Sequence, residues 1–206
     1  MTMNDLNMRA QKIRMLALDV DGVLTDGCIY YGNEGEELKS FSIKDGLGIK
    51  LLQQDDIEVV IITGRSSEIV ARRAQELGIA EVVQGREDKL TALREICSHR
   101  QLNTDQCAYM GDDLPDLAAV RAAGIGMAPA DAADQLRAAA DWISEFNGGA
   151  GAVRQGCVCA ACADAAQLGT LTPGAASKRH WKAPGLARRF PVPSPAAGLR
   201  PAALHR

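Results

Sequence analysis

Short apolar segments alternate with helical segments along the first three quarters of this 206-residue chain. The apolar segments are rich in Val, Ile, Leu and Met, and their lengths suit strands that are buried on both faces. They span residues 13–18, 57–62, 81–83, 108–110, 125–128 and 142–143. Because strands that alternate with helices form parallel sheets, we predict an α/β fold with a mostly parallel, doubly wound, Rossmann-like sheet.

One segment departs from this alternation. Residues 28–31 and 37–41 flank a Gly-Asn-Glu-Gly turn, a pattern typical of a β-hairpin. Its apolar side chains are Ile29, Tyr31, Leu38 and Phe41. A hairpin that precedes any crossover helix is an insertion after strand 1, and we expect it to pack against something else, such as another subunit.

Carboxylates follow the apolar segments at the points where strands should end. Asp19 and Asp21 come after the first segment and precede Gly22, while Asp112 and Asp113 come after the fourth. The carboxyl ends of parallel strands meet at one edge of the sheet, near the topological switch point where ligands bind. An acidic turn produces the same Asp-x-Asp-Gly pattern, so this motif alone does not decide between a turn and a site.

The residue types at this edge suit phosphoryl transfer. Carboxylate oxygens are the ligands that Mg²⁺ prefers, and several carboxylates held together need a cation. No His/Cys cluster accompanies them, which argues against zinc. Lys89 is placed to neutralise an anionic substrate, and the hydroxyl of Thr63 to donate to a phosphoryl oxygen. An Asp nucleophile would then form an aspartyl phosphate.

The motifs D-V-D-G-V at 19–23, Thr63, Lys89 and G-D-D at 111–113 resemble, in order and spacing, those of the haloacid dehalogenase superfamily over residues 13–154. The resemblance implies that Asp19 is the nucleophile and Asp21 the general acid and base. It implies Mg²⁺ on the carboxylates of Asp19 and Asp112 and on the backbone carbonyl of Asp21. Asp113 would support the metal site from outside, and Asp116 would order the loop rather than bind the metal.

Only the hairpin at 27–41 and one helix lie between the first two motifs, so no cap domain is expected. The run from Asp19 to Leu52, with T-G-R at 63–65 and G-G-A-G-A-V-R at 148–154, resembles the capless phosphatases of 3-deoxy-D-manno-octulosonate 8-phosphate. That family makes a free sugar acid for lipopolysaccharide. The resemblance implies Mg²⁺-dependent hydrolysis in a cytoplasmic homotetramer, whose hairpins meet at the centre and whose subunits close one another's sites.

The same resemblance implies a set of substrate contacts. Its members are Asp21, Ser42, Ile43, Lys44, Asp45, Gly46, Lys50, Gly64, Arg65, Arg73 and Lys89. The guanidinium groups of Arg65 and Arg73 suit the carboxylate of a sugar acid, although Arg73 also fits a solvated helix face. Phosphatases of nine-carbon, sialic-type keto acids typically carry glutamate at the position of Arg65. The eight-carbon substrate is therefore favoured, and a nine-carbon one is the alternative.

The sequence changes character after Arg154. Residues 155–206 hold seven Lys or Arg against one Asp, together with six of the eight prolines. The family instead continues with an acidic residue and an amphipathic helix. We therefore expect a phosphatase domain over 1–154 and an Ala/Pro/Arg-rich, largely disordered tail over 155–206.

Three interpretations of the tail stay open. Cys157, Cys159 and Cys162 could form a zinc or redox site, or the basic residues could bind nucleic acid or a membrane. We favour a frame-shifted C-terminus, and therefore expect neither nucleic acid nor membrane as a partner. A frame-shifted tail makes a non-catalytic relic conceivable, against which the intact motifs argue.

The remaining features agree with a cytoplasmic enzyme. No apolar run approaches the length of a membrane span, and the N-terminus lacks the pattern of a secretory signal. Cys28, Cys97 and Cys107 are expected to be buried, reduced thiols.

Overall fold

The computed structural model describes residues 3–35 and 37–161. Within this part of the chain, six parallel strands form one sheet in the order β5-β4-β1-β6-β7-β8. They are β1 (Met15–Leu18), β4 (Glu58–Ile62), β5 (Glu81–Val83), β6 (Cys107–Met110), β7 (Ile125–Ala128) and β8 (Trp142–Ile143). The predicted doubly wound parallel sheet is confirmed. From β1 the chain continues to β4 and β5 on one side and then crosses to β6 on the other, so the switch point lies between β1 and β6.

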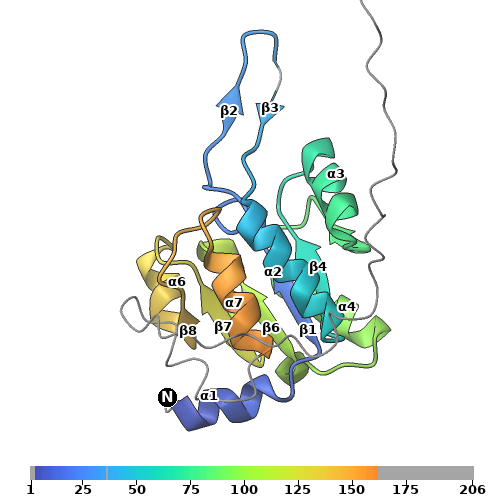
Figure 1. The fold of residues 1–206 in the computed structure, drawn as a ribbon, viewed down its shortest axis with the longest axis vertical. Helices are drawn as coiled ribbons and strands as arrows, with labels where there is room; N and C mark the ends of the chain where they lie inside the picture. The colour runs from blue at the N-terminus through green and yellow to red at the C-terminus, as the bar shows by residue number, and fades with distance from the viewer. Residues whose placement is uncertain (1–2, 36, 162–206) are drawn as a thin grey trace, which may run out of the picture. The chain divides into compact units, whose positions relative to one another are not determined.

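Helices cover both faces of the sheet (Figure 1). One face carries α1 (Met3–Ala10), α2 (Ile43–Gln54), α3 (Glu68–Leu77) and α7 (Ala152–Ala161). The other face carries α4 (Lys89–His99), α5 (Leu117–Ala122) and α6 (Asp134–Ala139). Alternate residues of β1 serve the two layers: Leu16 and Leu18 belong to the first core, and Met15 and Ala17 to the second.

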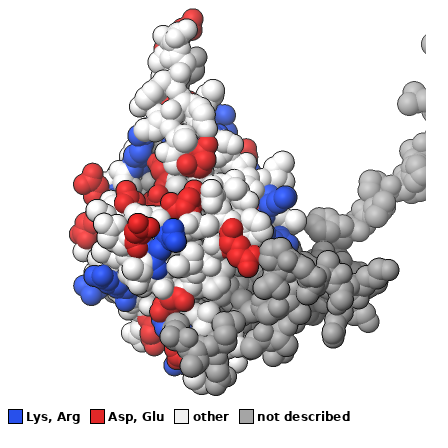
Figure 2. Space-filling model, turned by 90° about the vertical axis from the view of Figure 1, so that its left-hand side faces the viewer, with Lys and Arg blue, Asp and Glu red and all other residues white. Residues whose placement is uncertain are grey.

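The predicted hairpin is present but short. Its strands β2 (Tyr30–Tyr31) and β3 (Glu37–Leu38) are antiparallel, with Tyr30 opposite Leu38. It projects beyond the sheet and its helices in Figure 1, and in Figure 2 it is mostly uncharged, above a group of acidic side chains. Tyr31 is 70% exposed and Leu38 is 62% exposed in the single chain.

Helix α2 buries a different face from the one that the spacing of its leucines predicts. Leu47, Leu51 and Leu52 are spaced for one buried face, but Leu47 is exposed and Ile49 is buried beside Leu52. The reason is that α2 packs on α7 through Gly48, where a Cβ would lie 3.0 Å from the Cα of Arg154. This contact rotates Leu47 toward solvent.

Other expectations need correction near the ends of elements. The sequence analysis assigned nothing to the N-terminus, where α1 packs Leu6 and Ala10 into the core. The sequence also predicts one continuous helix over residues 114–123, but this segment begins as a 3₁₀ turn, Leu114–Asp116, before α5. Cys97 and Cys107 are buried as predicted, but Cys28 is exposed because it precedes the projecting hairpin.

Helix α7 crosses the domain boundary that was expected at residue 154. Cys157 and Cys159, in the proposed cysteine motif, are buried in the core on this helix. The third member, Cys162, and the rest of the tail through residue 206 lie outside the described residues. Disorder of that part therefore stays a prediction.

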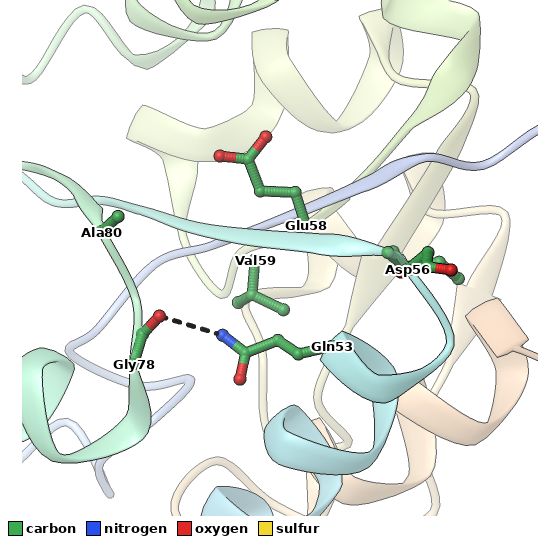
Figure 3. Close-up of a pocket in the computed structure, with 7 residues that line it drawn as sticks. Gln53, Asp56, Glu58, Val59, Gly78 and Ala80 are labelled. Atoms are coloured by element: carbon green, nitrogen blue, oxygen red, sulfur yellow. Dashed lines mark hydrogen bonds between the residues drawn. The ribbon is translucent and has the colours of Figure 1, made fainter. Parts of the chain in front are cut away.

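A shallow depression lies at the amino end of β4 (Figure 3). It is lined by Gln53, Glu58 and Gly78, among others, and the Gln53 amide donates to the Gly78 carbonyl at 3.4 Å. Because strands carry ligands at their carboxyl ends in such folds, this depression is not the candidate site. Among the described residues, none of the helices combines the length and the apolar character that a bilayer span requires.

Candidate active site

The carboxyl ends of three central strands lie level with one another. Leu18 of β1 pairs with Ile61 of β4 and with Met110 of β6. Asp19 continues this register, because its backbone N–H donates to the Met110 carbonyl at 3.0 Å. Asp19, Thr63 and Asp112 therefore emerge at one edge of the sheet, as the sequence predicted.

Three carboxylates converge at this edge. Asp19, Asp112 and Asp116 each contribute an oxygen to a cluster in which all three atoms lie within 4.8 Å of one another. Gly22 closes one side: its φ is +87°, and a Cβ there would lie 2.0 Å from Oδ2 of Asp112. Only glycine lets the loop after β1 come this close to the cluster.

Both carboxylate oxygens of Asp116 accept hydrogen bonds from other groups of the protein. Its Oδ1 accepts hydrogen bonds from Lys89 Nζ at 2.7 Å and from the Tyr109 hydroxyl at 2.8 Å. Its Oδ2 accepts from the backbone N–H groups of Asp112 at 3.2 Å and Asp113 at 3.4 Å. This fully buried carboxylate fixes the loop that carries Asp112, which agrees with the loop-ordering role expected for it.

Lys89 supplies the positive charge of the cluster. It is the first residue of α4 and is buried, and its Nζ lies 2.6 Å from Oδ2 of Asp19 and 2.7 Å from Oδ1 of Asp116. Burial alone would lower the pKa of this ammonium, but the charges of Asp19 and Asp116 raise it. Lys89 therefore stays protonated and holds one oxygen of Asp19 in place.

The cluster lacks positive charge even with Lys89 in it. Burial, followed by repulsion from Asp116, raises the pKa of Asp19 to about 6. Burial and repulsion from Asp19 raise the pKa of Asp112 to about 7. The Oδ1 atom of Asp19 is buried and has no hydrogen-bond partner among the described residues. Crowded carboxylates with an unused buried oxygen fit a hard divalent cation such as Mg²⁺.

Asp113 lies outside the cluster. Its side chain is exposed and accepts from the N–H of Leu114 at 2.8 Å, which caps the 3₁₀ turn. It can therefore support the metal site only through the loop. Thr63 is buried at the end of β4, and its carbonyl accepts from Arg86.

Asp21 belongs to a second group of charges, at the base of the hairpin. Its Oδ1 lies 2.5 Å from Lys39 Nζ, and its Oδ2 lies 3.8 Å from Arg65 Nε. Glu37 contacts both cations, at 3.4 Å each. The sequence analysis missed Lys39 and Glu37, because charged residues in a short hairpin strand are normally solvated and the sequence gives no sign that they turn inward.

Several of the predicted substrate contacts lie on α2 or at its N-cap. Ser42 caps the helix by accepting from Asp45 N–H at 3.4 Å. Ile43, Lys44 and Lys50 are exposed, and Gly46 is buried. Gly64, another predicted contact, is partly buried and directly follows Thr63.

Asp45 is placed differently from a substrate ligand. It is 1% exposed, and its carboxylate accepts from Gly151 N–H at 3.2 Å and from Arg154 N–H at 2.7 Å. These groups open α7, where a negative charge stabilises a helix. The carboxylate of Asp45 therefore fastens α2 to α7.

Arg73 reaches the first turn of α2 from α3. Its Nη2 donates to the Ser42 carbonyl at 3.4 Å, its Nη1 pairs with Glu76 at 3.1 Å, and its guanidinium lies over the Phe41 ring at 5.8 Å. A merely solvated helix face would make fewer of these contacts. The structure thus brings Arg73 to the candidate substrate region.

Comparison with known proteins agrees with this geometry. Residues 73–155 match the model of a haloacid dehalogenase-like hydrolase family. The chain is 46% identical over 154 residues to 3-deoxy-D-manno-octulosonate 8-phosphate phosphatase KdsC of Yersinia pestis, which covers 75% of this chain and 82% of the relative. The chain belongs to the haloacid dehalogenase-like hydrolase family. The enzyme of the same name from Escherichia coli K12 is 45% identical over 153 residues, 74% of this chain and 81% of its own.

Solved structures of this family share the fold. A 3-deoxy-D-manno-octulosonate 8-phosphate phosphatase from Moraxella catarrhalis, in complex with magnesium, phosphate and a KDO molecule, is 46% identical with a TM-score of 0.78. The match covers 82% of this chain and 97% of that one. A cobalt-bound phosphatase from Haemophilus influenzae is 38% identical with a TM-score of 0.73, covering 80% and 95% of the two chains. The chain is therefore a phosphoric monoester hydrolase by family.

Proposed function

We propose that this protein hydrolyses 3-deoxy-D-manno-octulosonate 8-phosphate to the free sugar acid and phosphate, with Mg²⁺ as cofactor, in lipopolysaccharide biosynthesis. The observation that carries the proposal is the group formed by the buried residues Asp19 and Lys89 and the partly buried Asp112 at the switch point of the sheet. The similarity to phosphatases of this name, at 45–46% identity over about four fifths of their length, supports the substrate.

Asp19 is the proposed nucleophile. Lys89 holds its Oδ2 and leaves its Oδ1 without a protein partner, so the carboxylate is oriented and still has a free oxygen. In the first step a carboxylate oxygen of Asp19 bonds to phosphorus, and the bond from phosphorus to the sugar oxygen breaks. The leaving oxygen takes a proton from Asp21.

The second step reverses the roles. A water molecule attacks the aspartyl phosphate and gives its proton to Asp21, and the bond from Asp19 to phosphorus breaks, which releases phosphate. Lys89 and the hydroxyl of Thr63, both buried residues, are the proposed donors to the phosphoryl oxygens in both steps.

Asp19, Asp112 and the backbone carbonyl of Asp21 are the proposed holders of Mg²⁺, which when bound would neutralise charge on the phosphoryl oxygens. Asp116 is excluded from this set because its oxygens already accept four hydrogen bonds. Asp113 supports the set by capping the turn that follows Asp112.

The sugar acid is proposed to lie between the first turn of α2 and the arginines of the neighbouring loops. Arg65 and Arg73 are the proposed partners of its carboxylate, because a guanidinium binds a carboxylate in two-pronged fashion. Further proposed contacts are Ser42, Ile43, Lys44, Gly46, Lys50 and Gly64. Asp45 contributes by fixing α2 rather than through its carboxylate.

The proposed assembly is a cytoplasmic homotetramer. A projecting hairpin with exposed Tyr31 and Leu38 is a surface that a second copy of the chain would cover. Because the described residues form no cap domain over the site, a neighbouring subunit is the proposed means of enclosing the substrate.

Phosphate release from a panel of substrates tests the proposal. The panel holds the eight-carbon sugar-acid phosphate, a nine-carbon keto-acid 9-phosphate, glycerol 3-phosphate and p-nitrophenyl phosphate, each with Mg²⁺ and with a chelator. We expect the highest kcat/KM for the eight-carbon compound and no turnover with chelator. A higher kcat/KM for the nine-carbon compound would support the alternative substrate, and no turnover at all would indicate a non-catalytic relic.

A further inference from the structure

The side chain of Lys39 is buried, whereas a lysine in a projecting hairpin is normally exposed to solvent. The hairpin projects toward solvent, yet the side chain of Lys39, one residue after β3, is 1% exposed. An ammonium that leaves water this completely must be paired, because burying an isolated charge is costly. Its partners are Oδ1 of Asp21 at 2.5 Å and Oε1 of Glu37 at 3.4 Å.

The two oxygens of Asp21 have different surroundings. Oδ1 accepts a hydrogen bond from Lys39, whereas Oδ2 lies 3.8 Å from Arg65, beyond hydrogen-bond distance. Arg65 is 43% exposed in its side chain and is also bound by Glu37 and Tyr31, both from the hairpin. Lys39 of the hairpin therefore binds Oδ1 of Asp21, whereas Oδ2 lies on the side of Arg65, which is proposed to bind substrate.

We propose that Lys39 is a positioning residue for Asp21, holding Oδ1 so that Oδ2 carries the transferred proton toward the leaving oxygen. This inference rests on the proposed function. An ammonium donates hydrogen bonds and accepts none, so Oδ1 serves Lys39 as an acceptor and Oδ2 is the oxygen left to exchange a proton with the substrate.

The proton balance of the two steps follows from this arrangement. As the bond from Asp19 to phosphorus forms, the leaving oxygen receives the proton of Oδ2, and Asp21 becomes a carboxylate with a cation beside each oxygen. In the second step Oδ2 takes the proton of the attacking water. Lys39 keeps its own protons throughout and never touches the substrate.

Leaving-group dependence separates this role from a structural one. A sugar alkoxide is a poor leaving group and needs a proton from the enzyme, whereas p-nitrophenolate leaves without one. Misplacing Oδ2 should therefore slow hydrolysis of sugar phosphates and spare hydrolysis of p-nitrophenyl phosphate.

The experiment compares Lys39→Met and Lys39→Gln with wild type on both substrates in the presence of Mg²⁺. We expect Lys39→Met to lower kcat for the sugar-acid phosphate by about 100-fold, the scale of a lost general acid, with KM and the p-nitrophenyl phosphate rate changed less than about threefold. Lys39→Gln keeps a donor for Oδ1 and should recover part of the loss. Lys12→Met, an exposed lysine next to α1, is the matched control.

Equal losses on both substrates, or a loss confined to KM, would overturn the positioning role. Melting curves identify a variant that fails to fold, and Lys39→Gln then decides the question. A wild type that hydrolyses glycerol 3-phosphate but not the sugar-acid phosphate would overturn the proposed substrate alone. The Lys39 comparison is then made with glycerol 3-phosphate against p-nitrophenyl phosphate.

Discussion

The carboxylate cluster and the hairpin differ in what they bury: the cluster buries charged side chains, whereas the hairpin exposes apolar ones. At the strand ends, Asp116 and Lys89 are buried, and each finds its partners within one chain. The hairpin has two strands of two residues each and exposes its large apolar side chains. The difference teaches that the groups proposed for bond breaking are held within a single chain, whereas the proposed closure of the site would need contacts from a second copy of the chain.

The largest expected effect comes from breaking the cluster. Asp19→Asn should lower kcat for phosphate release by about 10⁴-fold or more, because an amide cannot replace a nucleophilic carboxylate. The fold should survive, since the amide oxygen can still accept from Lys89. Steady-state kinetics and a melting curve check both points.

The control for that substitution is Asp134→Asn on α6, whose side chain is 95% exposed. It should change neither quantity. If phosphate release by Asp19→Asn equalled that of wild type, the covalent mechanism would be wrong.

The next effect should come from the hairpin. Leu38→Glu places a charge on the proposed subunit contact, so we expect the tetramer to dissociate and kcat/KM for the sugar-acid phosphate to fall about tenfold. Mg²⁺ binding should be unchanged, because the cluster lies within one chain. Light scattering coupled to chromatography measures the assembly.

Met8→Glu is the matched control for the hairpin, since Met8 is 53% exposed but lies on α1, at the other end of the sheet. It should leave the assembly intact. A Leu38→Glu protein with the mass of the wild type would exclude the hairpin as the contact.

A smaller effect should follow from pH in the metal-free protein. The pKa values of Asp19 and Asp112 are raised to about 6 and about 7, so folding favours their neutral forms. Their contribution to stability is therefore present below pH 4 and is lost as the pH rises through 6 and 7. Melting temperature without Mg²⁺ should decline from pH 5 to pH 8.

Added Mg²⁺ should reverse that decline. The increase in melting temperature on adding Mg²⁺ should be larger at pH 8 than at pH 5, because protons compete with the metal at lower pH. In Asp112→Asn the difference between the two pH values should shrink. An equal increase at both pH values would contradict a metal held by these carboxylates.

The smallest effect concerns Asp45. Asp45→Asn should cost about 1 kcal/mol of unfolding free energy, because it removes a charge from the start of α7. Urea unfolding measures this. An unchanged stability with a raised KM would instead mean that the carboxylate contacts the substrate.

Much of this picture follows from the sequence, and the exceptions share one cause. The strands and the positions of Asp19, Asp112 and Lys89 were predictable because parallel strands align their ends and register carries Asp19 beside Met110. The burial of Lys39 and the rotation of Leu47 were not. Each depends on a contact between segments distant in sequence, for which local patterns carry no signal.

The side-chain direction of Asp45 was also not predictable from the sequence. The resemblance places Asp45 in a substrate-binding segment, which stays a prediction, and in the structure Arg73 contacts the Ser42 carbonyl of that segment. It could not tell that the Asp45 carboxylate reaches 106 residues along the chain to Gly151. Side-chain direction within a motif is decided by packing, which a single sequence does not display.

The exposed thiol of Cys28 offers a practical probe of the region where substrate capture and assembly are proposed to meet. It precedes β2, and the other cysteines among the described residues are buried. A thiol-reactive fluorophore would therefore report from the base of the hairpin. Its emission would report on the proposed subunit association and substrate closure in real time, without an engineered cysteine among the described residues.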